Sequence, residues 1–176
     1  AFALDPLLKR LAESFRRAAV DRNQTLVFHQ TALWAESDPL MVERILANLI
    51  SNALRYTRVG GRILVAVRRR GDRVLLEVRD NGPGIAPEHQ EEIFAEFYQI
   101  GNSAREQGKG LGLGLSIVDR LARALQIAIH LRSAAGRGTT FGISLKATTP
   151  RIGVGLLGEV AQLPAVHFIG QGDDLE

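Results

Sequence analysis

The chain has 176 residues, 45% of them hydrophobic and none of them cysteine, which suits one domain with a sizeable core and excludes disulfides and thiolate metal sites. Its formal charge of +3 is typical of neither a strongly basic nor a strongly acidic chain. No apolar run approaches the roughly 20 residues that span a bilayer, and the N-terminus lacks the pattern of a signal peptide. We therefore expect a cytoplasmic domain that makes no membrane contact of its own.

Two amphipathic helices are predicted in the first third of the chain. Apolar residues recur at helical spacing over residues 4–18, and Asp5-Pro6 supplies a start signal. Residues 26–28 are predicted as a short strand. Asp38 in the N-cap position and Pro39 in the first turn then begin a second long helix, which continues through an apolar run to residue 56.

The second helix contains an unusual pair, Asn48 and Asn52. Residues four apart share a helix face, so both carboxamides project the same way from an apolar segment. A buried amide without partners costs about 1–3 kcal/mol. Either these two are satisfied core amides or they line a pocket that holds a polar ligand, and the glycine-rich segments further along the chain favour the pocket.

A β-hairpin is predicted next. Apolar residues alternate over 62–69 and 73–80, and Gly71-Asp72 lies between the two runs. Arginines at 68, 69 and 70 raise the alternative of a nucleic-acid contact, but no aromatic platform accompanies them, and a solvated turn is the better interpretation. The chain is therefore expected to bind no nucleic acid.

The C-terminal half is predicted to complete a layered fold. A short apolar helix is expected at 93–98, a longer helix at 113–125, and a closing pair of strands at 127–131 and 140–145. Helices on one face of a mixed, mostly antiparallel sheet make an α+β fold, a two-layer α/β sandwich.

Two polar clusters follow the predicted strands. Asp80 ends a strand and precedes the turn residues 81–85, which form either a plain turn or the base of a pocket where a carboxylate accepts from an exocyclic amine such as that of adenine. Glycines at 108, 110, 112 and 114 precede a helix, an arrangement that recurs in phosphate binding, although a loop without function is the alternative. Residues 101–110, with Arg105 and Lys109, are interpreted as a mobile lid that carries phosphate-neutralising charge.

Taken together, five motifs resemble those of the catalytic and ATP-binding domain of bacterial sensor histidine kinases, a Bergerat ATP-binding fold shared with gyrase and the mismatch-repair ATPases. The similarity covers about residues 2–145. The matching segments are the N box at 48–57, the adenine-reading motif at 80–85, the Phe box at 93–98, the phosphate loop at 110–118 and the closing motif at 136–141.

The resemblance implies ATP and Mg²⁺ as ligands and a role for each matching residue. Asn52 would be the Mg²⁺ ligand, with Asn48 beside it, while Arg55 would hold phosphate, Tyr56 would pack at the nucleotide and Asp80 would accept from adenine N6. Asn48, Asn52 and Arg55 are the expected catalytic residues. The other expected nucleotide-binding residues are Gly82, Gly84, Ile85, Lys109, Gly110, Leu111, Gly112, Leu113, Gly114, Leu115 and Thr139. The aromatic pair of the Phe box, Phe94 and Phe97, would either anchor the lid or fill the core.

Asn48 stands where ATP-hydrolysing members of the superfamily carry a glutamate, and an amide cannot act as a general base. We therefore expect a protein-histidine kinase domain that donates the γ-phosphate of ATP to a histidine on a separate dimerisation and phosphotransfer domain, in the same parent protein or in trans. A response regulator would act downstream in two-component signalling. None of His29, His89, His130 and His167 is predicted to be the acceptor.

Two alternatives remain from other classes: a serine kinase or ATPase of the same superfamily, and a nucleotide-binding regulatory module without transfer activity. Residues 1–147 are predicted to be the catalytic domain, and 148–176 a tail or linker. Within this tail, the apolar run 166–174 ends in two aspartates. It raises the alternative that a receiver domain begins there, in which case the parent protein would be a hybrid kinase. The parent protein of such a domain can be membrane-anchored.

Overall fold

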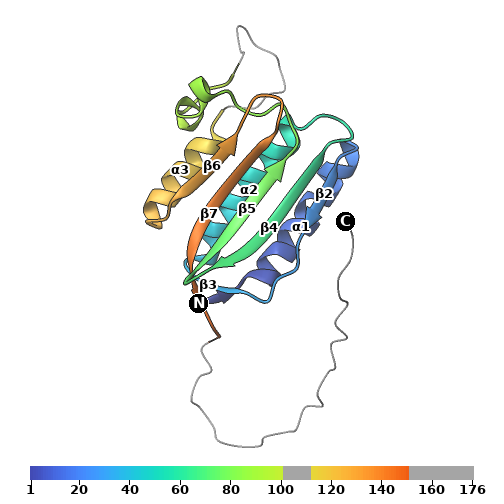
Figure 1. The fold of residues 1–176 in the computed structure, drawn as a ribbon. Coiled ribbons are helices and arrows are strands. Elements are labelled where there is room, and N and C mark those ends of the chain that lie inside the picture. Colours follow the sequence, from blue (N-terminus) through green and yellow to red (C-terminus); the bar gives the residue numbers. More distant parts are fainter. Residues whose placement is uncertain (101–111, 151–176) are drawn as a thin grey trace, which may run out of the picture.

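A computed structural model describes residues 1–100 and 112–150 of the chain, which form a two-layer α/β sandwich (Figure 1). The predicted lid at 101–110 and the tail from residue 151 onward lie outside the described residues. In chain order the elements are β1 (Phe2–Ala3), α1 (Leu4–Asp21), β2 (Thr25–Phe28), β3 (Trp34–Glu36), α2 (Pro39–Tyr56), β4 (Arg62–Arg70), β5 (Arg73–Asp80), the 3-10 turns η1 (Pro87–His89) and η2 (Glu92–Phe94), α3 (Gly114–Ala124), β6 (Ile129–Ser133) and β7 (Thr139–Thr148).

One mixed sheet of seven strands forms the first layer. Six of them follow the order β1-β3-β7-β5-β4-β2, and the seventh, β6, pairs with β7. Strand β7 is long enough to pair with two strands along one edge, β6 at its beginning and β3 at its end, while β5 occupies its other edge. All pairs are antiparallel except β2 with β4. The predicted fold class, a mixed and mostly antiparallel sheet, is confirmed.

The helices form the second layer and lie on one face of the sheet (Figure 1). Helix α2 buries a stripe of residues three and four apart, because that spacing puts them on one side of a helix. The strands contribute alternate residues to the same core. The buried residues of α2, β4 and β5 are Val42, Ile45, Leu46, Leu49, Ile50, Ala53, Leu54, Ile63, Val65, Ala66, Val74, Leu76, Glu77 and Val78, and of these Ala66 and Glu77 alone are on the opposite face of the sheet. Fully burying each Leu, Ile or Val contributes about 1.5–3 kcal/mol.

Local signals in the sequence placed several elements correctly. The Asp38 carboxylate caps α2 by accepting from the backbone N–H groups of Leu40 and Met41, at 2.9 and 3.0 Å. Strand β5 has the predicted bounds, and the hairpin turns at Gly71, whose φ is +60°. Helix α3 begins and ends one residue inside the predicted range.

Other predictions were wrong. The expected helix at 93–98 is only the single turn η2, because the chain turns extended at Ala95 and adopts a left-handed conformation at Phe97, with φ of +64°. Strand β6 begins at Ile129 instead of residue 127 and ends at Ser133, since Gln126, with φ of +54°, first turns the chain away from α3. Strand β7 extends past the predicted end because β3, too short to predict, pairs with its last residues.

No helix within the described part of the chain is long and apolar enough to cross a membrane.

Candidate nucleotide-binding site

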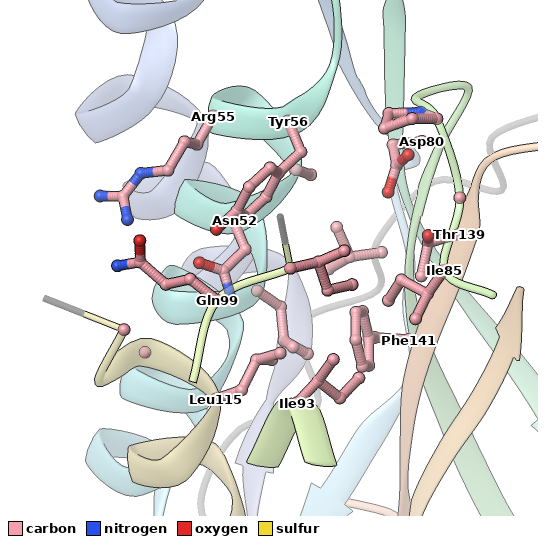
Figure 2. Close-up of a pocket in the computed structure, with 18 of the residues that line it drawn as sticks. Asn52, Arg55, Tyr56, Asp80, Ile85, Ile93, Gln99, Leu115, Thr139 and Phe141 are labelled. Atoms are coloured by element: carbon pink, nitrogen blue, oxygen red, sulfur yellow. The ribbon is translucent and has the colours of Figure 1, made fainter. Parts of the chain in front are cut away.

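A pocket of about 240 Å³ lies between α2, the ends of β5 and β7, and the first turn of α3 (Figure 2). Figure 2 shows Asn52 and Asp80 on opposite walls, with the ring of Phe141 lower in the view, on the strand side. Polar residues therefore stand at the two ends of a mainly apolar cavity. The apolar side chains that line it are Leu49, Ala53, Val78, Pro83, Ile85, Ile93, Ile100, Leu115 and Phe141.

Both asparagines of α2 lie against the first residue of α3. A Cβ added at Gly114 would be 3.3 Å from Asn52 Oδ1 and 3.6 Å from Asn48 Oδ1, so only glycine leaves this space open beside both carboxamides. Each asparagine is half-buried. Asn48 Nδ2 donates to the carbonyl of Arg44 at 2.8 Å, whereas Asn52 lines the pocket. The pair therefore faces the start of α3 and not the hydrophobic core.

The carboxylate of Asp80 is held at the other wall by backbone donors. Its Oδ1 accepts from the N–H of Gly82 at 2.8 Å, and the N–H of Thr139 also donates to it. Burial raises the pKa of Asp80, and these two hydrogen bonds oppose the rise. An ionised carboxylate accepts at about four lone-pair positions, so acceptor capacity is left for a ligand in the pocket.

Two glycines allow the closing turn to press against the Asp80 segment. A Cβ at Gly84 would be 1.9 Å from the carbonyl oxygen of Ala134, and one at Gly138 would be 2.0 Å from that of Asp80. Both glycines have positive φ, +71° and +78°. No other residue type fits such a contact and such a backbone conformation together.

A hydrogen-bond network that the sequence analysis missed supports this wall. Ser133 Oγ accepts from the N–H of Ile85 at 2.8 Å, donates to the carbonyl of Gly138 at 3.0 Å and lies 2.9 Å from Thr139 Oγ1. A hydroxyl has one hydrogen to donate, so Thr139 is the donor in the last contact. Thr139 therefore contacts Asp80 through its backbone and Ser133 through its side chain. Gln90 Nε2 adds a bond to the Ile85 carbonyl at 3.0 Å.

The remaining predicted site residues lie at the rim or outside the pocket. Arg55 and Tyr56, in the last turn of α2, are exposed rim residues, and Figure 2 shows the Arg55 guanidinium pointing away from the cavity. Gly112, Gly114 and Leu115 line the pocket. Leu113 is the N-cap of α3, Gly82 only bonds Asp80, and neither is among the lining residues. Lys109, Gly110 and Leu111 lie outside the described residues.

The two phenylalanines of the Phe box differ in their surroundings. Phe94 packs edge-on against Phe141, with ring centroids 6.3 Å apart, and so supports a pocket residue from behind. Phe97 is 67% exposed and therefore does not fill the core. Its N–H donates to the carbonyl of Gly112 at 3.1 Å. This backbone hydrogen bond joins the chain that precedes residue 101 to the chain that follows residue 111.

Comparison with known proteins identifies the class. Residues 37–149 match the family described as histidine kinase-, DNA gyrase B-, and HSP90-like ATPase, and the chain belongs to this family. Its relatives include sensor kinases: it is 36% identical to the sensor protein kinase PmrB of Pseudomonas aeruginosa over 148 residues, which cover 84% of this chain and 31% of PmrB. The chain thus spans about a third of the length of that relative.

Solved structures agree with this assignment. The nucleotide-free catalytic domain of histidine kinase ThkA has a TM-score of 0.71 at 25% identity, over 82% of this chain and 93% of that one. Full-length ShkA in complex with AMPPNP has a TM-score of 0.70 at 28% identity, over 85% of this chain and 31% of that one. The resemblance to histidine kinases and the predicted fold are confirmed.

Proposed function

We propose that this domain binds Mg·ATP in the pocket and donates the γ-phosphate to a histidine on a separate dimerisation and phosphotransfer domain, within a protein-histidine kinase of a two-component system. The observation that carries the proposal is the pocket itself. It has an anchored carboxylate at one end, two carboxamides beside a helix N-terminus at the other, and apolar side chains between them. That distribution suits a nucleotide, which has an amino-substituted flat ring at one end and phosphates at the other.

The Asp80 wall suits adenine. The carboxylate is held by Gly82 and Thr139 and would accept from the exocyclic amine, while Ile85 and Phe141 would cover the ring. A hydrogen bond to a charged acceptor contributes about 1.5–3 kcal/mol. The ShkA complex with AMPPNP, an ATP analogue, supports the same ligand class here.

The α3 end suits phosphate. The helix has no side-chain cap at Leu113, so the backbone N–H groups of its first turn remain available, and the helix dipole favours negative charge there. This start of α3 lies beside the Asn52 carboxamide. Phosphate oxygens bound there would therefore lie beside the carboxamide oxygen of Asn52, an atom that can coordinate a metal ion.

Asn52 is also the residue that would hold Mg²⁺. The described residues contain no group of three or more His, Cys, Asp or Glu side chains that could bind a metal ion. A single carboxamide oxygen fits Mg²⁺ nevertheless, because this ion is commonly bound by few protein ligands together with phosphates and water. When bound, Mg²⁺ supplies charge neutralisation on the phosphates.

The polar residues favour transfer to a protein nucleophile over hydrolysis. Asp80 is the only carboxylate among the described lining residues, and its backbone donors hold it at the wall opposite Asn52. Asn48, beside Gly114, cannot deprotonate water. An acceptor imidazole nitrogen would form a bond to the γ-phosphorus as the bond from phosphorus to the bridging oxygen breaks, with ADP as the leaving group.

The acceptor belongs to another domain in this proposal. None of the three histidines in the described ranges lines the pocket: His29 and His130 are exposed on strands or their ends, and His89 Nδ1 lies 2.7 Å from the hydroxyl of Tyr98. His167 is outside those ranges. Kinship with sensor kinases supports a phosphotransfer domain and a response regulator as the partners.

One experiment separates this function from its alternatives. The chain is incubated with Mg²⁺, γ-labelled ATP and a histidine-bearing helical hairpin domain from a sensor kinase. Acid-labile, alkali-stable label on that domain, absent when its histidine is replaced by alanine, is the expected result. Release of free phosphate would favour an ATPase, and tight ATP binding without transfer to any partner would favour a regulatory module.

A further inference from the structure

The face of the sheet opposite the helices carries a strongly basic surface that the nucleotide site does not use. Figure 1 shows no helix in front of β4, β5 and β7 on this side. Residues that alternate with the core positions of β4 to β7 point outward here. We call the cations among them the basic face: Arg62, Arg68, Arg70, Arg73, Arg79, Arg132 and Lys146.

A single buried carboxylate organises the centre of this surface. Glu77 is only 3% exposed, and its carboxylate binds Arg68 Nη2 at 2.6 Å, Arg132 Nη2 at 3.1 Å and, more closely still, Arg79. The three arginines come from β4, β6 and β5. Gly142 leaves the room for this cluster, since a Cβ there would be 3.3 Å from Glu77 Cγ.

The cluster stays charged near neutral pH. Burial raises the pKa of Glu77, but hydrogen bonds from Arg79 and Arg68 outweigh burial and hold that pKa below its usual value. Three cations around one anion leave an excess of positive charge. One carboxylate also cannot use all the donors of three guanidinium groups, each of which has five.

The arginines of the basic face are both held in place and accessible. The side chains of Arg68, Arg79 and Arg132 are 42%, 34% and 68% exposed although each binds Glu77. Arg73 is held by Ser144, whose hydroxyl and carbonyl accept from it at 2.7 and 2.8 Å. Side chains that are already ordered lose less entropy when a partner binds.

The structural role of the cluster does not account for the whole surface. Arg62 and Arg70 are exposed and form no ion pair with any described residue. Lys146 pairs with Glu36 at 2.9 Å, and Glu36 and Glu77 are the only carboxylates among the outward residues of strands β3 to β7. Seven cations against two anions exceed what a cross-strand ion-pair network needs.

We propose that the basic face is a docking surface for an acidic protein partner, one that presents several Asp or Glu carboxylates to the ordered arginines. Six of the seven cations are arginine, whose planar fork matches carboxylates, and Leu64, Ala66 and Leu75 lie between them. Enrichment in arginine and depletion of lysine are typical of protein–protein interfaces.

Other occupants fit this surface less well. A second copy of the chain would bring like charges together, which is unfavourable. Among the outward residues of β3 to β7, Trp34 at the β3 edge is the only Phe, Tyr or Trp, so the surface has one such ring and no row of them for single-stranded nucleic acids to stack on or for entry into a membrane interface. An acidic protein surface needs neither stacking nor insertion.

The test uses a decaglutamate peptide as the acidic probe and compares two triple variants. The first, Arg68→Gln with Arg79→Gln and Arg132→Gln, removes three cations from the basic face. The matched control removes the same charge from exposed arginines of α1 and α3, with Arg16→Gln, Arg17→Gln and Arg123→Gln.

We expect the peptide to bind the chain with backbone amide shifts confined to β4–β7 in nuclear magnetic resonance spectra. Its affinity should fall about tenfold in the face variant and less than twofold in the control, since each exposed ion pair contributes little but several act together. Two results with the peptide would overturn the proposal: equal losses of affinity in both variants, or no binding of the peptide at all. The proposal would also be overturned if the chain bound only phosphatidylserine vesicles or duplex DNA, with the face variant alone losing that binding.

A second pair of variants covers the case in which the face triple does not fold, because it leaves Glu77 buried without its partners. Arg132→Gln removes the most exposed of the three side chains and keeps Arg68 and Arg79 on Glu77. It should weaken peptide binding about twofold to threefold relative to Arg123→Gln, a control at another largely exposed arginine, on α3. Equal affinities for the two single variants would also overturn the proposal.

Discussion

Replacement of Asp80 by asparagine tests the adenine end of the proposed site with almost no change of shape. The carboxylate accepts from Gly82 and from Thr139, and in the proposal it accepts from adenine as well. Asparagine has one oxygen for these three donors, and its amide nitrogen is itself a donor. Loss of a hydrogen bond to a charged acceptor costs about 1.5–3 kcal/mol, so affinity for ATP should fall about ten- to 150-fold.

Isothermal titration calorimetry with AMPPNP measures this loss. Asp72→Asn is the matched control, because Asp72 is an exposed residue of the β4–β5 turn and does not line the pocket. Circular dichroism checks that both variants fold. An affinity within twofold of the parent chain for Asp80→Asn, or an equal loss in Asp72→Asn, would refute the assignment of Asp80.

The raised pKa of Asp80 adds a prediction about stability. Burial is the larger cause of the shift, and it disfavours the ionised form in the folded state. The unfolded chain therefore loses this proton at lower pH than the folded chain. Relative to Asp80→Asn, the parent chain should lose stability as pH rises from about the ordinary value of 3.8 through the raised pKa, and should change no further above it.

Urea unfolding of both proteins at a series of pH values checks the sign, because groups common to both cancel in the difference. A difference in unfolding free energy that stays constant, or that grows in favour of the parent chain with rising pH, would show that burial does not dominate at Asp80.

Three further predictions concern the two asparagines of α2 and a comparison of two glycines. Asn52→Ala should abolish Mg²⁺-dependent ATP binding, seen in calorimetry as loss of the difference between titrations with Mg²⁺ and with EDTA; an unchanged difference would remove Asn52 from the site. Asn48→Glu should raise release of free phosphate from ATP, since a carboxylate can act as a general base where an amide cannot, and a phosphate-release assay measures it. Gly60→Ala should cost about 1–2 kcal/mol for its φ of +75° in open space. Gly84→Ala should cost about 1–3 kcal/mol more, because its Cβ overlaps the carbonyl of Ala134, and equal costs in thermal unfolding would contradict the close contact.

Much of the fold could be read from local patterns. The cap at Asp38, the alternation in β5 and the turn at Gly71 each depend on residues only a few positions apart, and each is present in the structure. The order of the motifs was sufficient to recognise the family, because two asparagines four residues apart on a helix, an aspartate turn and a glycine loop rarely follow one another by chance. What these signals share is that neighbouring residues determine them.

The tertiary structure alone decided which distant residues meet. Strands β1 and β3 have two and three residues, too few for a periodic signal. Strand β3 exists because β7 offers an edge to pair with, and β1 pairs in turn with β3. The roles of Ser133 and Gln90 depend on the loop after β5 lying beside the end of β6. The cluster around Glu77 likewise depends on the register of four strands, β4, β5, β7 and β6. Sheet register and loop packing follow from contacts between residues far apart in the chain, and a sequence pattern read through short windows does not contain them.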